Sequence, residues 1–442
     1  MGASGEDPKL DAKFVKLWAA STTSALGSGL VTVAAPLYVA SRTSNPLMIS
    51  SITVVIWIPW LLFTLPGGVL VDRVDRRRLM IALDRSRFVV MAGLGVLILV
   101  GHAGLWVLFT ALFLIESGEV LFRSASSAMI PAVVPHQLLE RANGWLMGGA
   151  VTTQQMIAGP LGGFLFVVAA SIPFLANAGT YAVSAVLTAL IPGTYRAVTR
   201  QHTVGVAEDA ETAQPRGLAS IRADLAESFR FLMGQRILRT MAILIGVLNV
   251  TLTAALAVLV LLAKQRLHLG SVGYGLLFTA LAVGGVLGSS LGDRLVKRVT
   301  ATWTIRVGLI IEALTHLVLA ASSNPYLVGF AMFAFGIHAA LWTMVGSSLR
   351  QRLTPPDMMG RSASLNLFIA FGGNAIGAVL GGVLAKQFGI TAPYWVAFVV
   401  AAIVAASTWH VFSRAEVAKA YQTPPHLLLG DDPASVTEVA GA

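Results

Sequence analysis

The chain has 442 residues, of which 56% are hydrophobic and only 12% are charged, against about 25% charged residues in an average soluble domain. A soluble core of this composition would leave far too much apolar surface in water, which excludes a soluble enzyme, a coiled coil and a disordered chain. The net charge of +10 would suggest a nucleic-acid partner in a soluble protein. In a membrane protein, basic residues that flank the spans explain it, so no nucleic-acid partner is expected.

Twelve apolar runs are long enough to cross a membrane, which takes about 20 residues in a helix. The first is too long for the apolar part of a signal peptide, and the residues before it are mixed in charge. The sequence therefore predicts an all-α integral membrane protein with twelve transmembrane helices. They lie near 15–40, 47–70, 79–101, 105–130, 144–170, 173–192, 238–263, 272–292, 303–322, 326–349, 362–385 and 392–412.

The distribution of Lys and Arg predicts the orientation of these spans. If the N-terminus is cytoplasmic, only four of the 31 basic residues fall on outer loops: Arg42, Lys264, Arg266 and Lys386. Apart from Arg123, which lies within a span, the others fall on cytoplasmic loops, cytoplasmic helix ends or the tails. We therefore expect a multi-pass protein of the inner (cytoplasmic) membrane with both termini in the cytoplasm.

Two polar segments divide the chain. Residues 193–237 form a long cytoplasmic connection, whose second half carries Leu218, Ile221, Leu225, Phe229 and Leu232 at spacings of three and four, as in an amphipathic helix along the membrane surface. The tail, 414–442, contains three prolines and is expected to be disordered. Residues 1–192 and 238–413 then each form a six-helix bundle.

The two halves of the chain repeat each other at half its length. Asp72 and Arg73 after the second span recur 221 residues later as Asp293 and Arg294, and Arg141 after the fourth span recurs 220 residues later as Arg361. Such a repeat predicts two pseudo-symmetric bundles that enclose a site near the membrane midplane, and rocking of the bundles exposes this site alternately to each side.

At these positions the sequence resembles a major facilitator superfamily transporter. The loop after the second span resembles the superfamily signature through Gly68, Leu70, Asp72, Arg73 and Arg76, with Asp75 where Gly is usual. The fifth span contains Gly159, Pro160, Leu161, Gly162 and Gly163, which resembles the motif of the drug:proton antiporter groups. The runs SAMIPAVVPHQLLERANG and IPFLANAGTYAVSAVL are similar to the subgroup of macrolide-type exporters and the enterobactin exporter. The resemblance implies a transporter that works as a monomer.

Each of these two motifs has a physical interpretation. In the first, Asp72 can meet the partly positive N-terminal end of a helix in the other half, and the arginines can pair with cytoplasmic carboxylates. Together with Asp293, Arg294, Arg141 and Arg361 they would form a gating latch; the alternative is that the arginines only determine topology. The second motif would bend and tightly pack the fifth span, or be ordinary small-residue packing.

Placing a charged side chain inside the membrane costs free energy, so such residues indicate function. The fourth span lacks the R-x-x-Q-G pattern of the better-known drug antiporters and carries Glu116, Glu119 and Arg123 on one helix face. Glu119 has Arg123 one turn away and is expected to stay ionised, so Glu116 is the better proton carrier. Glu312 with His316 in the ninth span is the second candidate. Alternatively, these groups only hold helices together. Asp84, Arg85 and Arg87 lie near the cytoplasmic end of the third span.

Aromatic and amide side chains are candidates for a substrate cavity, although each can also face lipid or form an interhelical hydrogen bond. They are Trp57, Trp60, Gln154, Asn177, Asn249, Phe335, His338, Trp342 and Asn374.

No phosphate-binding loop, Cys/His metal cluster or Ser/His/Asp motif is visible, and Cys is absent, so neither ATP hydrolysis, nor a metal, nor another cofactor is expected. The sequence predicts a secondary active exporter, not an enzyme, that exchanges small amphipathic compounds for protons. The alternative is a siderophore or lysolipid exporter or flippase, for whose anionic cargo Arg123 is the one buried arginine. A receptor that no longer transports is disfavoured by the intact Asp72 and Asp293.

Overall fold

The computed structural model describes residues 10–196, 229–355 and 358–413, and every regular element in these ranges is helical. The N-terminal half contains α1 (Ala12–Arg42), α2 (Pro46–Arg73), α3 (Arg76–Leu99), α4 (Leu105–Val133), a short turn η1 (His136–Leu138), α5 (Leu139–Ala150), η2 (Val151–Ile157), α6 (Ala158–Val168) and α7 (Ile172–Ala189). The predicted fifth span is built from α5, η2 and α6, and η2 is a seven-residue π-helix within it.

The C-terminal half contains α9 (Arg236–Ala257), α10 (Leu259–Gln265), α11 (Ser271–Ala321), α12 (Pro325–Leu353), α13 (Met359–Phe388) and α14 (Ala392–Thr408). The predicted seventh span breaks between α9 and α10. The predicted eighth and ninth spans both lie in α11, which is bent at Thr300, where φ is 72°.

Ten helical stretches of the described ranges are long and apolar enough to cross a membrane. The two other predicted spans correspond to α3, which carries Asp84, Arg85 and Arg87, and to α14, which is 17 residues long. The helical ends follow local signals: Asn45 and Asn324 cap α2 and α12, and the proline after each cap has the backbone angle that a first helical turn needs.

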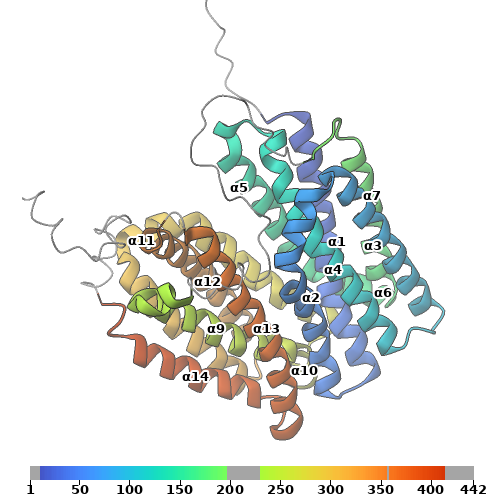
Figure 1. Cartoon of the computed structure of the whole chain (residues 1–442). Coiled ribbons are helices and arrows are strands. Elements are labelled where there is room, and N and C mark those ends of the chain that lie inside the picture. The colour runs from blue at the N-terminus through green and yellow to red at the C-terminus, as the bar shows by residue number, and fades with distance from the viewer. Residues whose placement is uncertain (1–9, 197–228, 356–357, 414–442) are drawn as a thin grey trace, which may run out of the picture.

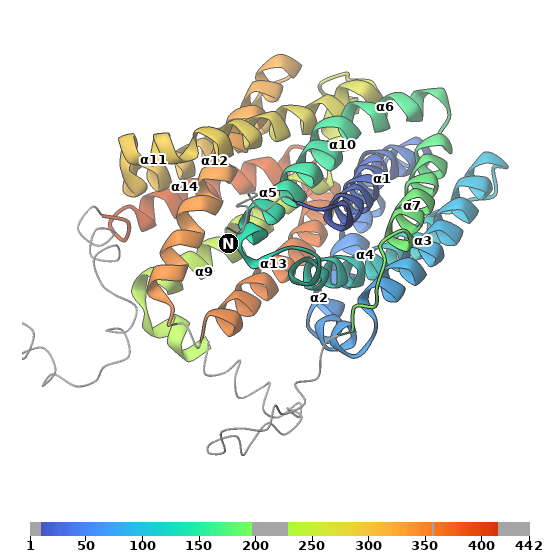
Figure 2. The same ribbon diagram turned by 90° about the horizontal axis from the view of Figure 1, so that it is seen from above.

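The internal repeat is visible in the helix boundaries. Helices α4 and α12 begin 220 residues apart, at Leu105 and Pro325, and the same offset separates the starts of α5 and α13 and those of α7 and α14. The chain therefore folds as two equivalent bundles. The same two bundles are seen from two directions in Figure 1 and Figure 2.

The two bundles meet at one end of the molecule and diverge at the other (Figure 1). We call the end with the 42–46 turn the 42–46 face and the end with the 73–76 turn the 73–76 face. Near the 42–46 face one apolar core contains residues of both halves, such as Leu37 of α1 and Leu262 of α10. There Lys264 Nζ also donates a hydrogen bond to the Ala40 carbonyl at 3.1 Å.

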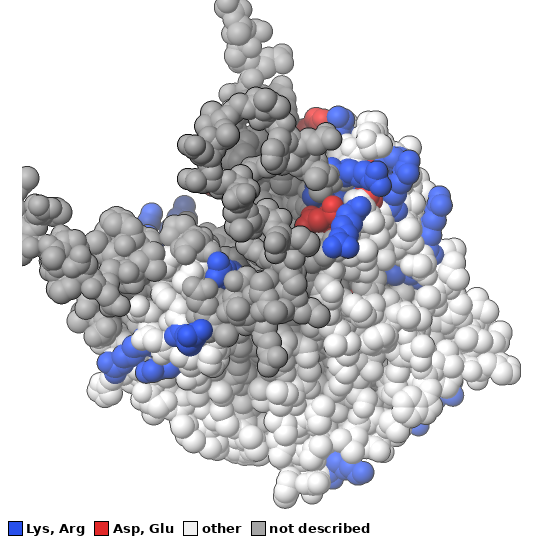
Figure 3. Space-filling model, viewed as in Figure 1, with Lys and Arg blue, Asp and Glu red and all other residues white. Residues whose placement is uncertain are grey.

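Charged side chains gather at the rims of the molecule, and a broad uncharged surface lies between them (Figure 3). Exposed apolar side chains such as Trp106, Phe164 and Phe330 contribute to the uncharged surface. This is the surface of an integral membrane protein, as the sequence predicts.

Two predicted segments lie partly or wholly outside the described residues: the connection 193–237 and the tail 414–442. The expected amphipathic residues Leu218, Ile221 and Leu225 lie outside the described residues, as does the tail 414–442. Residues 229–234 are helical, and Leu232 is buried in the core of the C-terminal half.

Candidate functional site

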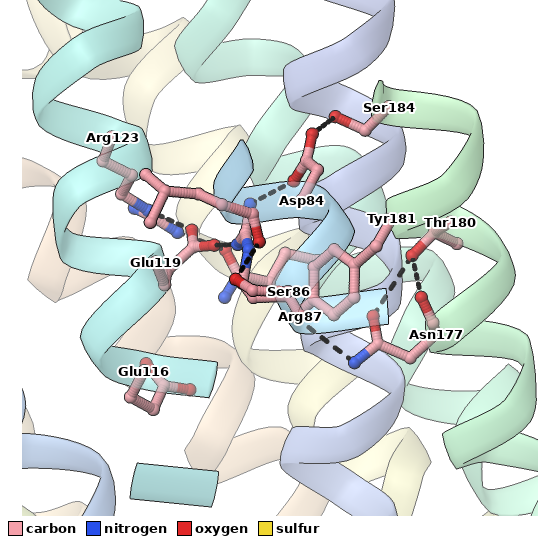
Figure 4. A network of polar contacts seen from close by, with 12 residues as sticks. Asp84, Ser86, Arg87, Glu116, Glu119, Arg123, Asn177, Thr180, Tyr181 and Ser184 are labelled. Atoms are coloured by element: carbon pink, nitrogen blue, oxygen red, sulfur yellow. Dashed lines mark hydrogen bonds and ion pairs between the residues drawn. The ribbon is translucent and has the colours of Figure 1, made fainter. Parts of the chain in front are cut away.

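Several charged side chains, among them the buried Asp84, Arg87 and Glu119, form one network inside the N-terminal bundle (Figure 4). Glu119 of α4 accepts hydrogen bonds from two arginines, from Arg87 Nη1 at 2.5 Å and from Arg123 Nε at 2.7 Å. Arg123 also donates to Gln154 Oε1 in η2 at 3.2 Å. Glu119 is therefore a carboxylate paired with two arginines, and through them it ties α3, α4 and η2 together.

Arg87 and Asp84 of α3 complete this network. Arg87 pairs with Asp84, which also accepts a hydrogen bond from Ser184 Oγ of α7 at 2.7 Å. The guanidinium lies over the rings of Phe122 and Tyr181, at 4.6 and 4.4 Å from their centres. The sequence placed Asp84 and Arg87 near the cytoplasmic end of the third span but did not predict that they pair. The i,i+3 spacing of opposite charges on a membrane helix is the signal that could have identified the pair.

A glycine makes room for Arg87. A β-carbon added to Gly118 of α4 would lie 3.0 Å from Arg87 Cδ, so the arginine stem passes across the place where a side chain would stand. Gly118 is therefore needed for α3 and α4 to approach each other around a buried arginine.

Glu116 lies one turn from Glu119 but has a different environment. In the described residues it forms no ion pair, and Trp60 Nε1 of α2 donates to its Oε2 at 3.2 Å. Trp60 and Trp57 both lie against Phe371 of α13, with ring centres 5.6 Å apart in each pair. Glu116 thus lies one side chain away from the contact between the two bundles.

The equivalent helix pair of the C-terminal half carries a second buried cluster. His338 Nε2 of α12 lies 3.2 Å from Glu312 Oε2, and His316 Nε2 lies 3.6 Å from Glu312 Oε1. All three side chains are buried. His338 takes the place of a side chain on Gly308, whose added β-carbon would lie 2.2 Å from Nδ1. The sequence predicted the Glu312 and His316 pair but not that His338 joins it.

Several predicted cavity residues line one hollow in the C-terminal half. A cavity of about 280 Å³ between α9 and α12 is bordered by Asn249, Phe335, His338 and Trp342, and Glu312 lies at its wall. A cavity of about 310 Å³ in the N-terminal half is bordered by Glu119 and Arg123. Each polar cluster therefore reaches a cavity of its own half.

Two other predicted cavity residues are engaged between or within helices. Asn374 of α13 is buried and accepts a hydrogen bond from Thr253 of α9 at 2.8 Å. Asn177 of α7 is fully buried, and Gly27 of α1 leaves the space for it. Both positions fit the alternative in which these amides join helices.

The residues of the predicted latch lie at the 73–76 face. Asp72 is 68% exposed and, among the described residues, its polar contact is with Arg76 at 3.5 Å. Arg76 donates to the Ala128 carbonyl within the same half, and Arg73 and Arg294 are exposed, while Arg141 borders a cavity between α1 and α5. Arg361 lies in the first turn of α13, and the side chain of Asp293 lies outside the description. A β-carbon added to Gly68 would have no neighbouring atom within 4 Å among the described residues.

The glycine- and proline-containing motif of the fifth span lies at the junction of the two bundles. β-Carbons added to Gly159 and Gly163 would lie 2.6 and 2.3 Å from the Gly275 and Ser271 carbonyls of α11, so the two backbones are in direct contact. Gly162 contacts α1 in the same way. Pro160 has no N–H for the Met156 carbonyl four residues earlier, and Thr279 Oγ1 of α11 donates to this carbonyl at 3.1 Å.

The comparisons with known proteins agree with this architecture. The family model described as a transmembrane secretion effector, MFS_3, matches residues 4–429. The chain belongs to this family of the major facilitator superfamily. Its fold is similar to that of a bacterial homologue of the human lysosomal transporter Spinster, solved in an inward-facing and unoccupied conformation, with a TM-score of 0.72 and 13% identity over 94% of this chain and 99% of that one.

Sequence relatives include two efflux proteins. The multidrug efflux pump Tap of Mycobacterium tuberculosis is 24% identical over 385 residues, which is 85% of this chain and 87% of the relative. Macrolide efflux protein A of Streptococcus pyogenes is 28% identical over 136 residues, which is 30% of this chain and 33% of the relative. The match to this second protein thus spans one third of its length.

One expectation about this major facilitator chain is wrong. Arg123 is not the one buried arginine, because its side chain is 44% exposed while that of Arg87 is 1% exposed. Both arginines are already paired with Glu119, which leaves neither of them free to bind an anionic cargo.

Proposed function

We propose that the chain is a secondary active exporter that moves small amphipathic compounds out of the cytoplasm in exchange for protons, by alternating access of its two bundles. Membership in a family described as a secretion effector and similarity to macrolide and multidrug efflux proteins support the direction of transport. The transporter acts as a monomer in the inner membrane and needs no cofactor.

The position of Glu116 carries the proposal for proton coupling. Of the three carboxylates near α4, Glu119 pairs with two arginines and Asp84 with one, whereas Glu116 accepts one neutral hydrogen bond from Trp60. A carboxylate without a cationic partner can take up a proton without breaking an ion pair. Since Trp60 lies against Phe371 of the other bundle, proton binding at Glu116 acts next to the moving contact.

The C-terminal cluster would serve as a second proton site. Glu312 lies between His316 and His338, so a proton can be shared among three groups that border the 280 Å³ cavity. Histidine is suited to this role because its charge changes near neutral pH.

The conformation fits a carrier that is open on one side. We take the 73–76 face as cytoplasmic, because it carries the arginine-rich loop of residues 73–78, and the bundles diverge there. The latch between Asp72 and the other half would then form only in the opposite conformation.

Transport by purified protein in lipid vesicles tests the proposal. Radiolabelled erythromycin should accumulate in vesicles only while a pH gradient is imposed, and collapse of the gradient should stop it. Glu116→Gln should lose gradient-driven accumulation but keep exchange of labelled for unlabelled compound, since exchange needs no net proton movement. Glu140→Gln, an exposed carboxylate at the start of α5, is the matched control. Accumulation that ignores the gradient would disprove proton coupling.

A siderophore or lysolipid exporter of the same fold is the second candidate. An anionic cargo of this kind needs a cation in the cavity that is not already paired, and Arg123 does not meet this condition. If Arg123→Ala abolishes transport of erythromycin and of an anionic compound alike, Arg123 acts through Glu119 rather than by binding the cargo.

A further inference from the structure

A cavity of about 380 Å³ lies between the end of α12 and the start of α13, at the 73–76 face. Its border includes Ser347, Arg350 and Thr354 of the α12 end, and Met359 and Ser362 of the first turn of α13. None of these residues belongs to the proposed proton sites or to the predicted latch. Arg361 of the predicted latch is the neighbour of Ser362 in the sequence.

Arg350 is a cation for which the described residues supply no partner. In the described part of the chain it forms no hydrogen bond or ion pair, and it borders both this cavity and the 280 Å³ cavity that contains Trp342. Its guanidinium folds back toward the membrane interior, since a β-carbon added to Gly346, one turn deeper in α12, would lie 3.4 Å from Nη1. An arginine that only marked topology would instead extend toward the lipid headgroups.

Two further groups around this cavity favour an anion. Thr354 is 3% exposed, and its hydroxyl has no hydrogen-bond partner among the described residues, although a buried hydroxyl normally has one. Helix α13 begins at Met359 without a side-chain cap, so the positive dipole end of a 30-residue helix lies at the cavity wall. A guanidinium, a free hydroxyl and a helix N-terminus thus converge on one space.

We propose that this cavity binds an oxyanion, a carboxylate or phosphate group, of the transported compound. The apolar part of the compound lies along the cavity between α9 and α12 toward Trp342, eight residues or about 12 Å deeper in the membrane. This rests on the proposed transport function and adds a second chemical class of cargo beside basic macrolides such as erythromycin: an amphipathic compound with an acidic group near one end.

Two observations distinguish this subsite from the predicted latch and from arginines that only determine membrane topology. Asp72 is exposed and contacts Arg76, so this carboxylate does not fill the cavity in the present conformation. Arg352, two residues further along α12, is exposed and does not border the cavity, so it provides a matched control with the same charge.

Equilibrium binding of a matched dye pair tests the subsite independently of transport. Rhodamine B carries a free carboxylate, and its methyl ester does not. Fluorescence anisotropy with the purified full chain in dodecyl maltoside should show rhodamine B binding at least tenfold tighter than the ester. Arg350→Gln should abolish this preference, Arg350→Lys should keep part of it, and Arg352→Gln should leave it unchanged. Equal binding of the two dyes by the natural chain, or equal losses in both Gln variants, would overturn the proposal.

A second measurement does not depend on a dye. The chain has no Cys, so Thr354→Cys introduces a single thiol at the cavity wall. This thiol should react faster with a negatively charged methanethiosulfonate reagent, relative to a positively charged one, than a free thiol does, and Arg350→Gln should remove that preference. Rhodamine B should slow the reaction and its ester should not. If phosphatidylglycerol nanodiscs alone give the same protection, a lipid headgroup occupies the site and the assignment to cargo is wrong.

Discussion

Arg87 holds two carboxylates of the N-terminal bundle at once, and its own side chain is almost completely buried. A buried charge that loses its partner is costly, because the remaining ion has neither water nor a counterion. Arg123 still neutralises Glu119 when Arg87 is absent, but Asp84 would keep only the hydroxyl of Ser184. Arg87 therefore has a structural role that is distinct from the proton transfer proposed for Glu116.

Arg87→Ala should lower the free energy of unfolding by about 3–5 kcal/mol, because it leaves Asp84 buried without a cation. Unfolding of the purified chain in mixed dodecyl maltoside and SDS micelles measures this change. Arg85→Ala removes an exposed arginine from the same helix and should change stability by less than about 0.5 kcal/mol. Adding Asp84→Asn to Arg87→Ala should restore part of the loss. Similar effects of the two arginines would contradict the structural role.

Single residues were the least predictable part of the site from sequence. The i,i+4 spacing of Glu119 and Arg123 identified their pair, because both lie on one helix. Arg87 and His338 depend on contacts between helices, with Glu119 in one case and Glu312 in the other. Their places are made by Gly118 and Gly308, and a lone glycine in a membrane helix does not reveal what fills the space beside it.

Two acidic residues near the turn between α2 and α3 have different roles. Asp75 caps α3 by accepting from the Arg78 amide at 2.8 Å, and its other oxygen accepts from the Tyr195 amide at 2.7 Å. Arg76 N donates to the Tyr195 carbonyl at 3.1 Å. Asp75 therefore anchors the turn to the chain after α7, which gives a physical reason for an aspartate where the superfamily signature has glycine. Asp72 lies three residues earlier and stays exposed.

Substitution of Asp75 should affect mainly the stability of the chain, and substitution of Asp72 mainly its transport. Asp75→Ala should destabilise the chain by about 1–3 kcal/mol through the lost cap and the lost contact to Tyr195. Asp72→Ala should change stability by less than about 0.5 kcal/mol, since an exposed pair contributes little, but should slow transport strongly if its partner lies in the other conformation. Detergent unfolding and vesicle uptake of erythromycin measure both properties. A large loss of stability in Asp72→Ala would rule out this division.

At the scale of the whole molecule, the 220-residue offset was enough to predict two bundles, because equivalent helices must begin at equivalent positions. It could not predict at which end the bundles diverge, since in the proposed alternating-access cycle the same sequence forms both conformations. The divergence of the bundles at the 73–76 face accompanies particular contacts near the opposite face. There the backbones of α6 and α11 meet at Gly159 and Gly275, and Lys264 reaches the Ala40 carbonyl.

The hydrogen bond from Thr279 to the Met156 carbonyl joins the two bundles and should favour this conformation. Thr279→Val keeps the size of the side chain and removes the bond, which is worth about 0.5–1.5 kcal/mol, so the ratio of open to closed 73–76 face should fall by about 2- to 12-fold. Because the chain has no Cys, spin labels at Glu140→Cys and Arg298→Cys can report the separation of α5 and α11 by pulsed electron resonance. Thr32→Val removes a hydroxyl that bonds within α1 alone and is the control. A distance distribution that Thr279→Val leaves unchanged, or that Thr32→Val alters equally, would show that this bond does not set the conformational balance.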